Sequence, residues 1–133
     1  MAGRMSQGEF IGRAVGIPWV RWRGDWQACD CFGLIVLYHL EVLGIDLGPV
    51  PQTDIATGFS VASGWLECEP AAGATCFMAW IDGAPTHCGV LLQGDRVLHS
   101  EGAAENAGNV RVSRLAAVAR VYGPIRCYRY ATC

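Results

Sequence analysis

The apolar residues of this 133-residue chain change their spacing after Pro70, from a helical pattern to short extended runs. Two gaps between these runs, Asp82-Gly83-Ala84-Pro85 and Gln93-Gly94-Asp95, are turn sequences. They predict an antiparallel meander, to which two later runs add strands. The predicted strands cover residues 75–80, 86–92, 96–100, 110–112 and 125–130. Helices followed by an antiparallel sheet predict the α+β class.

Each of the three predicted helices before that point has a recognisable N-terminal residue. Ser6 stands three residues before Glu9, the spacing of a capping box, and apolar residues then follow at helical intervals. A first helix is therefore predicted over residues 7–15. Asp54 is placed to cap a further helix over residues 55–63.

The remaining helix is predicted over residues 31–43, with Asp30 as its N-cap and Gly44 after its last turn. Apolar residues surround almost its whole circumference, which predicts a buried, central position. Cys31 opens this helix. The first amide groups of a helix lack intrahelical partners and carry partial positive charge, so they stabilise a thiolate and can help hold an oxyanion. Cys31 is therefore the candidate nucleophile.

Two histidines lie downstream on predicted strands. His87 is near the beginning of residues 86–92, and His99 is near the end of residues 96–100. Because these two strands form one predicted hairpin, the two imidazoles can share an edge of the sheet. A cysteine nucleophile needs a base and a group that orients the base. The predicted catalytic residues are therefore Cys31, His87 and His99.

Neighbouring cysteines and a third histidine have other interpretations. Cys29 precedes the helix and is the weaker candidate nucleophile, and Cys88 alternates to the opposite strand face from His87, which predicts a core position. His39 lies on another face of the helix than Cys31 and is interpreted as structural or surface. A zinc or iron–sulfur site is the main chemical alternative, with Cys29, Cys31, His87 and Cys88 as its ligands. The spacing of these residues argues against it, because structural zinc sites usually have Cys-x₂₋₄-Cys pairs and this set has none.

Composition limits the classes of protein that fit. The net charge is −2 and the ten basic residues are dispersed, so nucleic acid is not an expected partner. No run approaches the ~20 apolar residues of a membrane span. Residues 1–16 have no continuous apolar segment of a signal peptide, so synthesis in the cytoplasm is expected. Seven irregularly spaced cysteines predict reduced core thiols, and the length predicts one domain over residues 1–133.

Four motifs have a combined pattern that is typical of one enzyme family. They are Gly16-Ile17-Pro18-Trp19, Cys29-Asp30-Cys31-Phe32-Gly33-Leu34-Ile35 with Tyr38 and Gly44, His87-Cys88-Gly89-Val90, and Val97-Leu98-His99. With them the chain resembles the NlpC (NlpC/P60) family of cell-wall cysteine peptidases over residues 10–130. The most similar branch is that of phage tails and phage-like gene transfer agents. The chain departs from the family at Phe32, where a small residue is usual, and at Gly73-Ala74, where Gly-Asp is usual.

The resemblance implies a papain-like α+β fold and hydrolysis of an amide in the peptide stem of bacterial peptidoglycan, usually between D-γ-glutamate and a diamino acid. Cys31 would attack the carbonyl, His87 would carry the proton, and His99 would fix the tautomer of His87. The backbone N–H of Cys31 is the expected oxyanion donor, and a second donor is expected within residues 19–27. No cofactor is implied.

The same resemblance implies partners and a place of action. We expect tail hub or fibre proteins to bind this chain, and a phage-like tail to carry it to the bacterial cell wall. The candidate contact segments are residues 19–26, rich in tryptophan, and Tyr128-Arg129-Tyr130. Residues 19–26 are equally a candidate lining of a substrate groove. Two alternatives stay open, namely a non-catalytic structural tail-tip subunit, and a thiol amidase or acyltransferase on the same fold.

Overall fold

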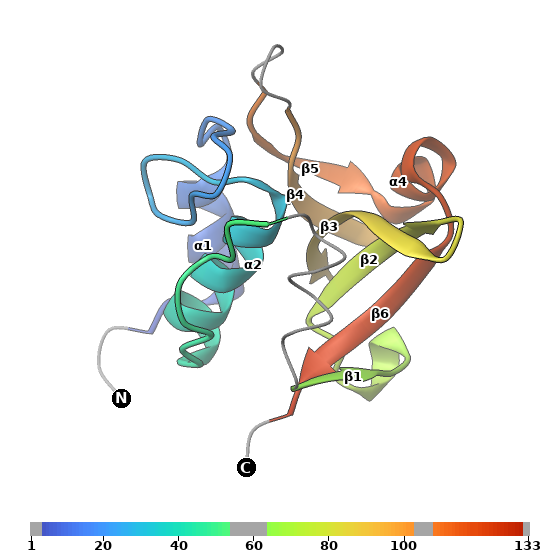
Figure 1. Cartoon of the computed structure of the whole chain (residues 1–133). Helices are drawn as coiled ribbons and strands as arrows, with labels where there is room; N and C mark the ends of the chain where they lie inside the picture. Colours follow the sequence, from blue (N-terminus) through green and yellow to red (C-terminus); the bar gives the residue numbers. More distant parts are fainter. Residues whose placement is uncertain (1–3, 54–63, 103–107, 132–133) are drawn as a thin grey trace.

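An antiparallel sheet of six strands forms the centre of the protein, in a computed structural model that describes residues 4–53, 64–102 and 108–131 (Figure 1). The strands are β1 (Trp65–Glu67), β2 (Cys76–Ile81), β3 (Ala84–Leu92), β4 (Arg96–Ser100), β5 (Val110–Arg114) and β6 (Ile125–Tyr130). Their order in the sheet is β1-β6-β2-β3-β4-β5. The predicted meander is confirmed as β2 to β5, and the last strand lies between β1 and β2.

The turn between β2 and β3 is tighter than predicted. Asp82 and Gly83 both have positive φ, 51° and 78°, which is the backbone of a two-residue hairpin turn. Ala84 and Pro85 therefore belong to β3 and pair with β2. The predicted four-residue turn was therefore wrong. Pro85 lies within β3 opposite Trp80, at the point where the pairing of β2 with β3 shifts.

The helix α1 (Gln7–Ala14) begins as predicted. The Ser6 hydroxyl accepts a hydrogen bond from the Glu9 amide, and the Glu9 carboxylate accepts one from the Ser6 amide. The predicted helix over residues 55–63 lies outside the described residues. No helix within the described ranges is long and apolar enough to cross a membrane.

The helix α2 (Cys31–Tyr38) starts at the predicted residue and is almost wholly buried. It continues as a π-helical segment, η1 (His39–Leu43), and the chain turns away at Gly44, whose φ is 69°. The predicted extent of this helix is thus confirmed, but its last turn is wider than an α-helical turn. Its apolar circumference is explained by its position between α1 and the sheet (Figure 1).

Helices cover both faces of the sheet. α1 and α2 lie on one face, where Met78, Val90 and Leu98 complete the core. A helix that the sequence did not predict, α4 (Leu115–Tyr122), covers the other face, where Phe77 and other apolar residues pack against it. The remaining unpredicted elements are the edge strand β1 and a short 3₁₀ segment, η2 (Pro70–Ala72).

Successive side chains of β3 and β4 point to opposite faces of the sheet. Cys88 belongs to the core on the α2 face, as predicted. His87 and His99 lie on the α4 face, where the ring of Tyr122 packs against both. The pairing of β2 with β3 shifts between Ala79 and Trp80, next to the pair Ala79 and His87. This irregularity lies close to the end of β3 that carries His87.

Candidate active site

Cys31 is the first residue of α2 and is half-buried. It lines a groove of about 550 Å³ together with residues of the preceding loop and of β3. The groove is lined by Trp19, Arg21, Trp22, Asp30, Cys31, Thr53, Pro85 and Thr86. The thiol therefore lies at a helix N-terminus and at the surface of a cleft, the two conditions that a reactive cysteine needs.

Asp30 fixes the start of this helix. Its Oδ1 accepts a hydrogen bond of 2.7 Å from the amide of Gly33, and its Oδ2 accepts one of 2.7 Å from the amide of Trp22. Trp22 itself has a positive φ of 64°. One carboxylate thus caps α2 and also holds the loop beside the groove. Burial raises the pKa of this carboxyl to about 6, against the effect of the amide hydrogen bonds.

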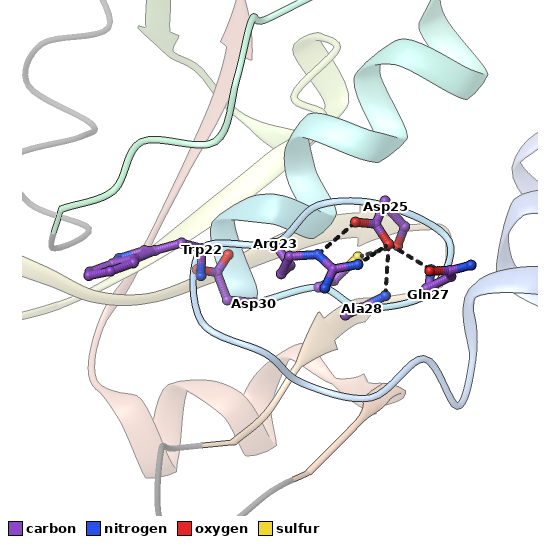
Figure 2. A network of polar contacts seen from close by, with 7 residues as sticks. Trp22, Arg23, Asp25, Gln27, Ala28 and Asp30 are labelled. Atoms are coloured by element: carbon purple, nitrogen blue, oxygen red, sulfur yellow. Dashed lines mark hydrogen bonds and ion pairs between the residues drawn. The ribbon is translucent and has the colours of Figure 1, made fainter.

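A second aspartate organises the rest of the loop (Figure 2). Asp25 forms an ion pair of 2.8 Å with Arg23 and accepts hydrogen bonds from the amides of Gln27 and Ala28. The ion pair lowers the pKa of Asp25. Because both side chains of the pair are nearly half exposed, we attribute loop order mainly to the two amide hydrogen bonds.

Two glycines allow this loop to cross directly over the helix start. A Cβ at Gly24 would lie 2.7 Å from the carbonyl oxygen of Gly33, and a Cβ at Gly33 would collide with the backbone of Arg23. The close approach explains the Cys-x-Gly motif. Glycine is needed two residues after Cys31 because the loop backbone occupies the space of a side chain.

The two predicted histidines are in direct contact. Nε2 of His87 lies 2.9 Å from Nδ1 of His99, and Nε2 of His99 lies 2.7 Å from Oγ of Ser113. Both imidazoles are buried. Burial and the neighbouring His87 lower the pKa of His99 to about 4, so that His99 is neutral at pH 7. A neutral His99 that donates from Nε2 to Ser113 accepts at Nδ1 from His87.

The Cys31 thiol interacts with the side chains of Cys88 and His87. Hydrogen bonds from Cys88 and then from His87 lower its pKa to about 5, and burial opposes them. Because Nε2 of His87 faces His99, the ring nitrogen that remains for Cys31 is Nδ1. The structure therefore brings Cys31, His87 and His99 together in this order, and the hydrogen bonds to Cys31 favour its thiolate form.

Tyr122 and Glu101 are site residues that the sequence did not reveal. The ring of Tyr122 stacks on His87 at 4.0 Å with an angle of 20°. Its hydroxyl donates a hydrogen bond of 2.6 Å to Glu101, which also pairs with Arg111 at 3.3 Å. Burial and then Glu101 raise the pKa of Tyr122. Tyr122 lies on the unpredicted helix, so its position had no signal in the sequence.

Cys29 and His39 are not part of this arrangement. Cys29 is fully buried, and its thiol donates to the carbonyl oxygen of Asp25 at 3.2 Å. Burial raises the pKa of Cys29 to about 12. His39 is also fully buried and bonds the carbonyl of Ile35 and the hydroxyl of Thr75. The structural interpretation of His39 is thus confirmed.

Within the described ranges, no three His, Cys, Asp or Glu residues are grouped so that they could hold a metal ion.

Comparisons with known proteins agree on one family. The model of the NlpC/P60 family matches residues 18–120, a segment that includes all three predicted catalytic residues. The crystal structure of the NlpC/p60 domain of the peptidoglycan hydrolase SagA superposes with a TM-score of 0.58 at 19% identity, over 85% of this chain and 87% of that chain. The predicted papain-like α+β fold is confirmed by this superposition. No match was found among curated proteins.

Proposed function

Because the chain belongs to the NlpC/P60 family, we propose that it is a cysteine peptidase that hydrolyses an amide bond in the peptide stem of bacterial peptidoglycan. The observation that carries this proposal is the continuous contact from Cys31 through His87 to His99 at the edge of a groove. The substrate class is supported by the family and by the name of the structural neighbour, a peptidoglycan hydrolase.

Cys31 acts as the nucleophile in the proposed reaction. Its thiolate attacks the carbonyl carbon of the scissile amide. The oxyanion of the tetrahedral intermediate accepts a hydrogen bond from the backbone N–H of Cys31 at the start of α2. His87 then delivers a proton from Nδ1 to the leaving amine, which breaks the C–N bond and leaves a thioester on Cys31. Water, deprotonated by the same nitrogen, hydrolyses the thioester and restores the thiolate.

His99 orients the base. Its neutral ring accepts the Nε2–H of His87 at Nδ1, and Ser113 holds the other ring nitrogen. This arrangement keeps the exchangeable proton of His87 on the nitrogen that faces Cys31. The ring of Tyr122 stacks on the imidazole of His87. The base is therefore fixed in orientation and tautomer before substrate binds.

The composition of the groove suits a peptide that carries carboxylates. Arg21 supplies a cation, and the indoles of Trp19 and Trp22 supply flat apolar surfaces near it. Guanidinium groups bind carboxylates with two parallel hydrogen bonds. The stem peptides of peptidoglycan are acidic, which supports the proposed substrate class.

The place of action is the finer part of the proposal. The motifs resemble those of peptidases in phage tails and gene transfer agents, so we place this chain in a phage-like tail that carries it to the cell wall, with a tail hub or fibre protein as partner. Purified particles should contain the protein in stoichiometric, salt-resistant amounts. Particles without it, combined with free enzyme in the lysate, would contradict tail association and leave the peptidase proposal standing.

Digestion of purified murein tests the peptidase activity. We expect the wild-type protein to release peptides whose masses identify one cleaved amide. Cys31→Ala should abolish this release, and the matched variant Cys29→Ala should retain most of it, because Cys29 lies away from the groove. A folded wild-type protein that binds murein without releasing peptides would support the structural tail-tip alternative. Turnover of a different amide or ester would support the alternative thiol enzyme.

A further inference from the structure

Cys68 and Cys127 lie opposite each other at one edge of the sheet. The last pair in the ladder of β1 with β6 is Glu67 and Tyr128. The next step along this antiparallel register places Cys68 opposite Cys127, and the amide of Cys68 donates a hydrogen bond of 3.0 Å to the carbonyl oxygen of Cys127. Figure 1 shows β1 beside β6 at this edge. Two thiols that the proposed reaction does not use are therefore cross-strand neighbours.

Both side chains point to the face of the sheet that α4 covers. Cys127 belongs to the core cluster on that face, together with Phe77, its partner on β2. Directly opposite residues of an antiparallel pair project from the same face, so Cys68 points there as well. The Cα atoms of a hydrogen-bonded antiparallel pair are about 5.5 Å apart. This separation lies within the roughly 4.4–6.8 Å that a disulfide bond spans, so the backbone already holds the two cysteines at disulfide distance.

The other cysteines that the structure describes occupy different places. Cys29, Cys76 and Cys88 belong to the core on the α2 face, and Cys31 lines the groove. The sheet therefore separates the three core thiols from the pair on the α4 face. Among the described cysteines, strand register brings this one pair into opposition.

We propose that Cys68 and Cys127 form a disulfide bond when the protein meets a small-molecule disulfide, such as oxidised glutathione, in an oxidising compartment. The Cys68 thiolate attacks one sulfur of the small disulfide, whose S–S bond breaks, and a thiolate leaves and takes up the proton that Cys68 lost. The Cys127 sulfur then attacks the Cys68 sulfur of the mixed disulfide, and the second small thiol leaves with the proton of Cys127. Two protein thiols are oxidised, and one small disulfide is reduced to two thiols.

The exposure of the two residues determines the order of the attacks. Cys68 is half-buried, whereas only 9% of Cys127 is exposed, so a small disulfide reaches Cys68 first. Burial, followed by the neighbouring Cys68, Glu69 and Glu67, raises the pKa of Cys127. A thiol of this kind stays protonated at neutral pH and reacts slowly. The bond is therefore a slowly formed structural link, in contrast to the reactive thiol of Cys31.

The link would secure β1, which has three residues and lies at the edge of the sheet. The ring of Trp65 on β1 packs against Tyr130 and against Phe32, at centroid distances of 5.0 Å and 6.4 Å. Phe32 directly follows Cys31 on α2. A fixed β1 therefore supports the helix that carries the nucleophile. The timing of the oxidation rests on the proposed function, because it assumes a peptidase that acts at the cell wall, outside the reducing cytoplasm.

Mass spectrometry of the oxidised protein tests the proposal without any activity measurement. The reduced full-length protein is incubated with oxidised glutathione, free thiols are alkylated, and linked residues are located by tandem mass spectrometry after digestion. We expect Cys68 to be joined to Cys127, with a mass lower by about 2 Da for the two hydrogens lost. The oxidised protein should have a Tm roughly 10 °C above that of the reduced protein, because the bond closes a long loop of the unfolded chain. Dithiothreitol should reverse both effects.

Variants make the result specific. In Cys127→Ala no second thiol displaces the small thiol, so Cys68 should keep one bound glutathione. In Cys68→Ala, which changes a half-buried residue at the sheet edge, the difference in Tm between the oxidised and reduced protein should disappear. Cys76→Ala, which removes a thiol from the opposite face, should form the bond as the wild type does. The same is expected of Cys133→Ser, whose position lies outside the described residues.

Two results would overturn the proposal. One is that Cys68 and Cys127 remain free thiols in the folded protein after treatment with oxidised glutathione, and the other is that Cys68 is joined to a different cysteine. Murein cleavage by a protein with both thiols free would overturn the disulfide and leave the peptidase proposal standing. A joined pair in a protein without murein activity would support the disulfide and contradict the peptidase.

Discussion

Substitution of Gly89 by alanine should damage both the fold and the catalytic histidines. A Cβ at this position would lie 2.6 Å from the carbonyl oxygen of Leu98, 2.7 Å from the ring of Phe77 and 2.9 Å from the Cβ of His99. Non-bonded carbon atoms come to rest at about 3.5–4.0 Å. Two of the three neighbours, the Leu98 backbone and the His99 Cβ, belong to β4, so they can yield only if the strand moves.

The free-energy change has two opposing parts. Replacing glycine by alanine within a strand ordinarily stabilises by roughly 0.5–1 kcal/mol, because the unfolded chain loses freedom. Overpacking of this kind costs about 1–3 kcal/mol. We expect Gly89→Ala to reduce the free energy of unfolding by about 1–2 kcal/mol, which corresponds to a Tm lower by about 4–8 °C. Because His99 is one of the displaced residues, murein cleavage should fall by about 10²-fold, the usual effect of a misplacement near 1 Å.

Urea unfolding followed by tryptophan fluorescence measures the first effect, and initial rates on murein measure the second. Gly12→Ala is the matched control, since a Cβ at Gly12 meets no atom within 4 Å and the residue lies inside α1. It should raise stability by about 0.5–1 kcal/mol and leave the rate unchanged. Stability of Gly89→Ala equal to or above that of the wild type would refute the steric explanation of the His-x-Gly motif.

Three further predictions concern the catalytic residues. The rate of Cys31 alkylation by iodoacetamide should stay near its maximum from pH 8 to 6 and fall to half near pH 5, because the lowered pKa keeps the thiolate above that pH; a tenfold loss per pH unit below pH 8 would contradict this. His87→Ala should lose as much murein cleavage as Cys31→Ala, whereas His99→Asn should keep partial activity by still accepting from His87; equal activity of both histidine variants with the wild type would contradict their roles. Tyr122→Phe should keep the stacked ring and lose at most about tenfold in rate, whereas Tyr122→Leu should lose more and shift the pH profile of the rate; identical profiles for the two variants would contradict the support of His87 by the ring.

The parts of the fold with local signals were predictable from sequence. The Ser6 and Glu9 pair marks the start of α1, Asp30 marks the start of α2, and turn residues separate the strands of the meander. Each signal acts within a few residues, so it needs no knowledge of the tertiary structure. Alternation along a strand also predicted that Cys88 faces away from His87.

The unpredicted features depend on long-range packing. The N-cap residue of α4 is Arg114, whose side chain makes no capping hydrogen bond, and the helix has only about two turns, so its start carries no signal in the sequence. The pairs of Tyr122 with His87 and with Glu101 follow from the way this helix docks on the sheet. The packing of Cys31 against the core cluster that contains Cys88 depends on how α2 lies over β3, and residue spacing along either element does not encode that register.

The membership of Cys31, His87 and His99 in one site was predictable from the sequence, but the contacts and partners of the two imidazoles were not. Placing His87 and His99 on one hairpin predicted that they could meet, and the structure gives their contact as 2.9 Å between ring nitrogens. The role of Ser113 as the partner of His99 was missed, because the predicted strand ended one residue before it. The close passage of the loop at Gly24 over Gly33 was equally invisible in the sequence.

Covalent capture of the nucleophile tests the central claim most directly. A stem-peptide analogue in which an electrophilic ketone replaces the scissile amide is incubated with the wild-type protein, with Cys31→Ala and with His87→Ala, and the adducts are located by peptide mapping. We predict one adduct, on Cys31, which forms more slowly in His87→Ala, is absent from Cys31→Ala, and is prevented by excess murein fragments. An adduct on another cysteine, or none in a preparation that cleaves murein, would contradict the assignment of Cys31 as the catalytic nucleophile.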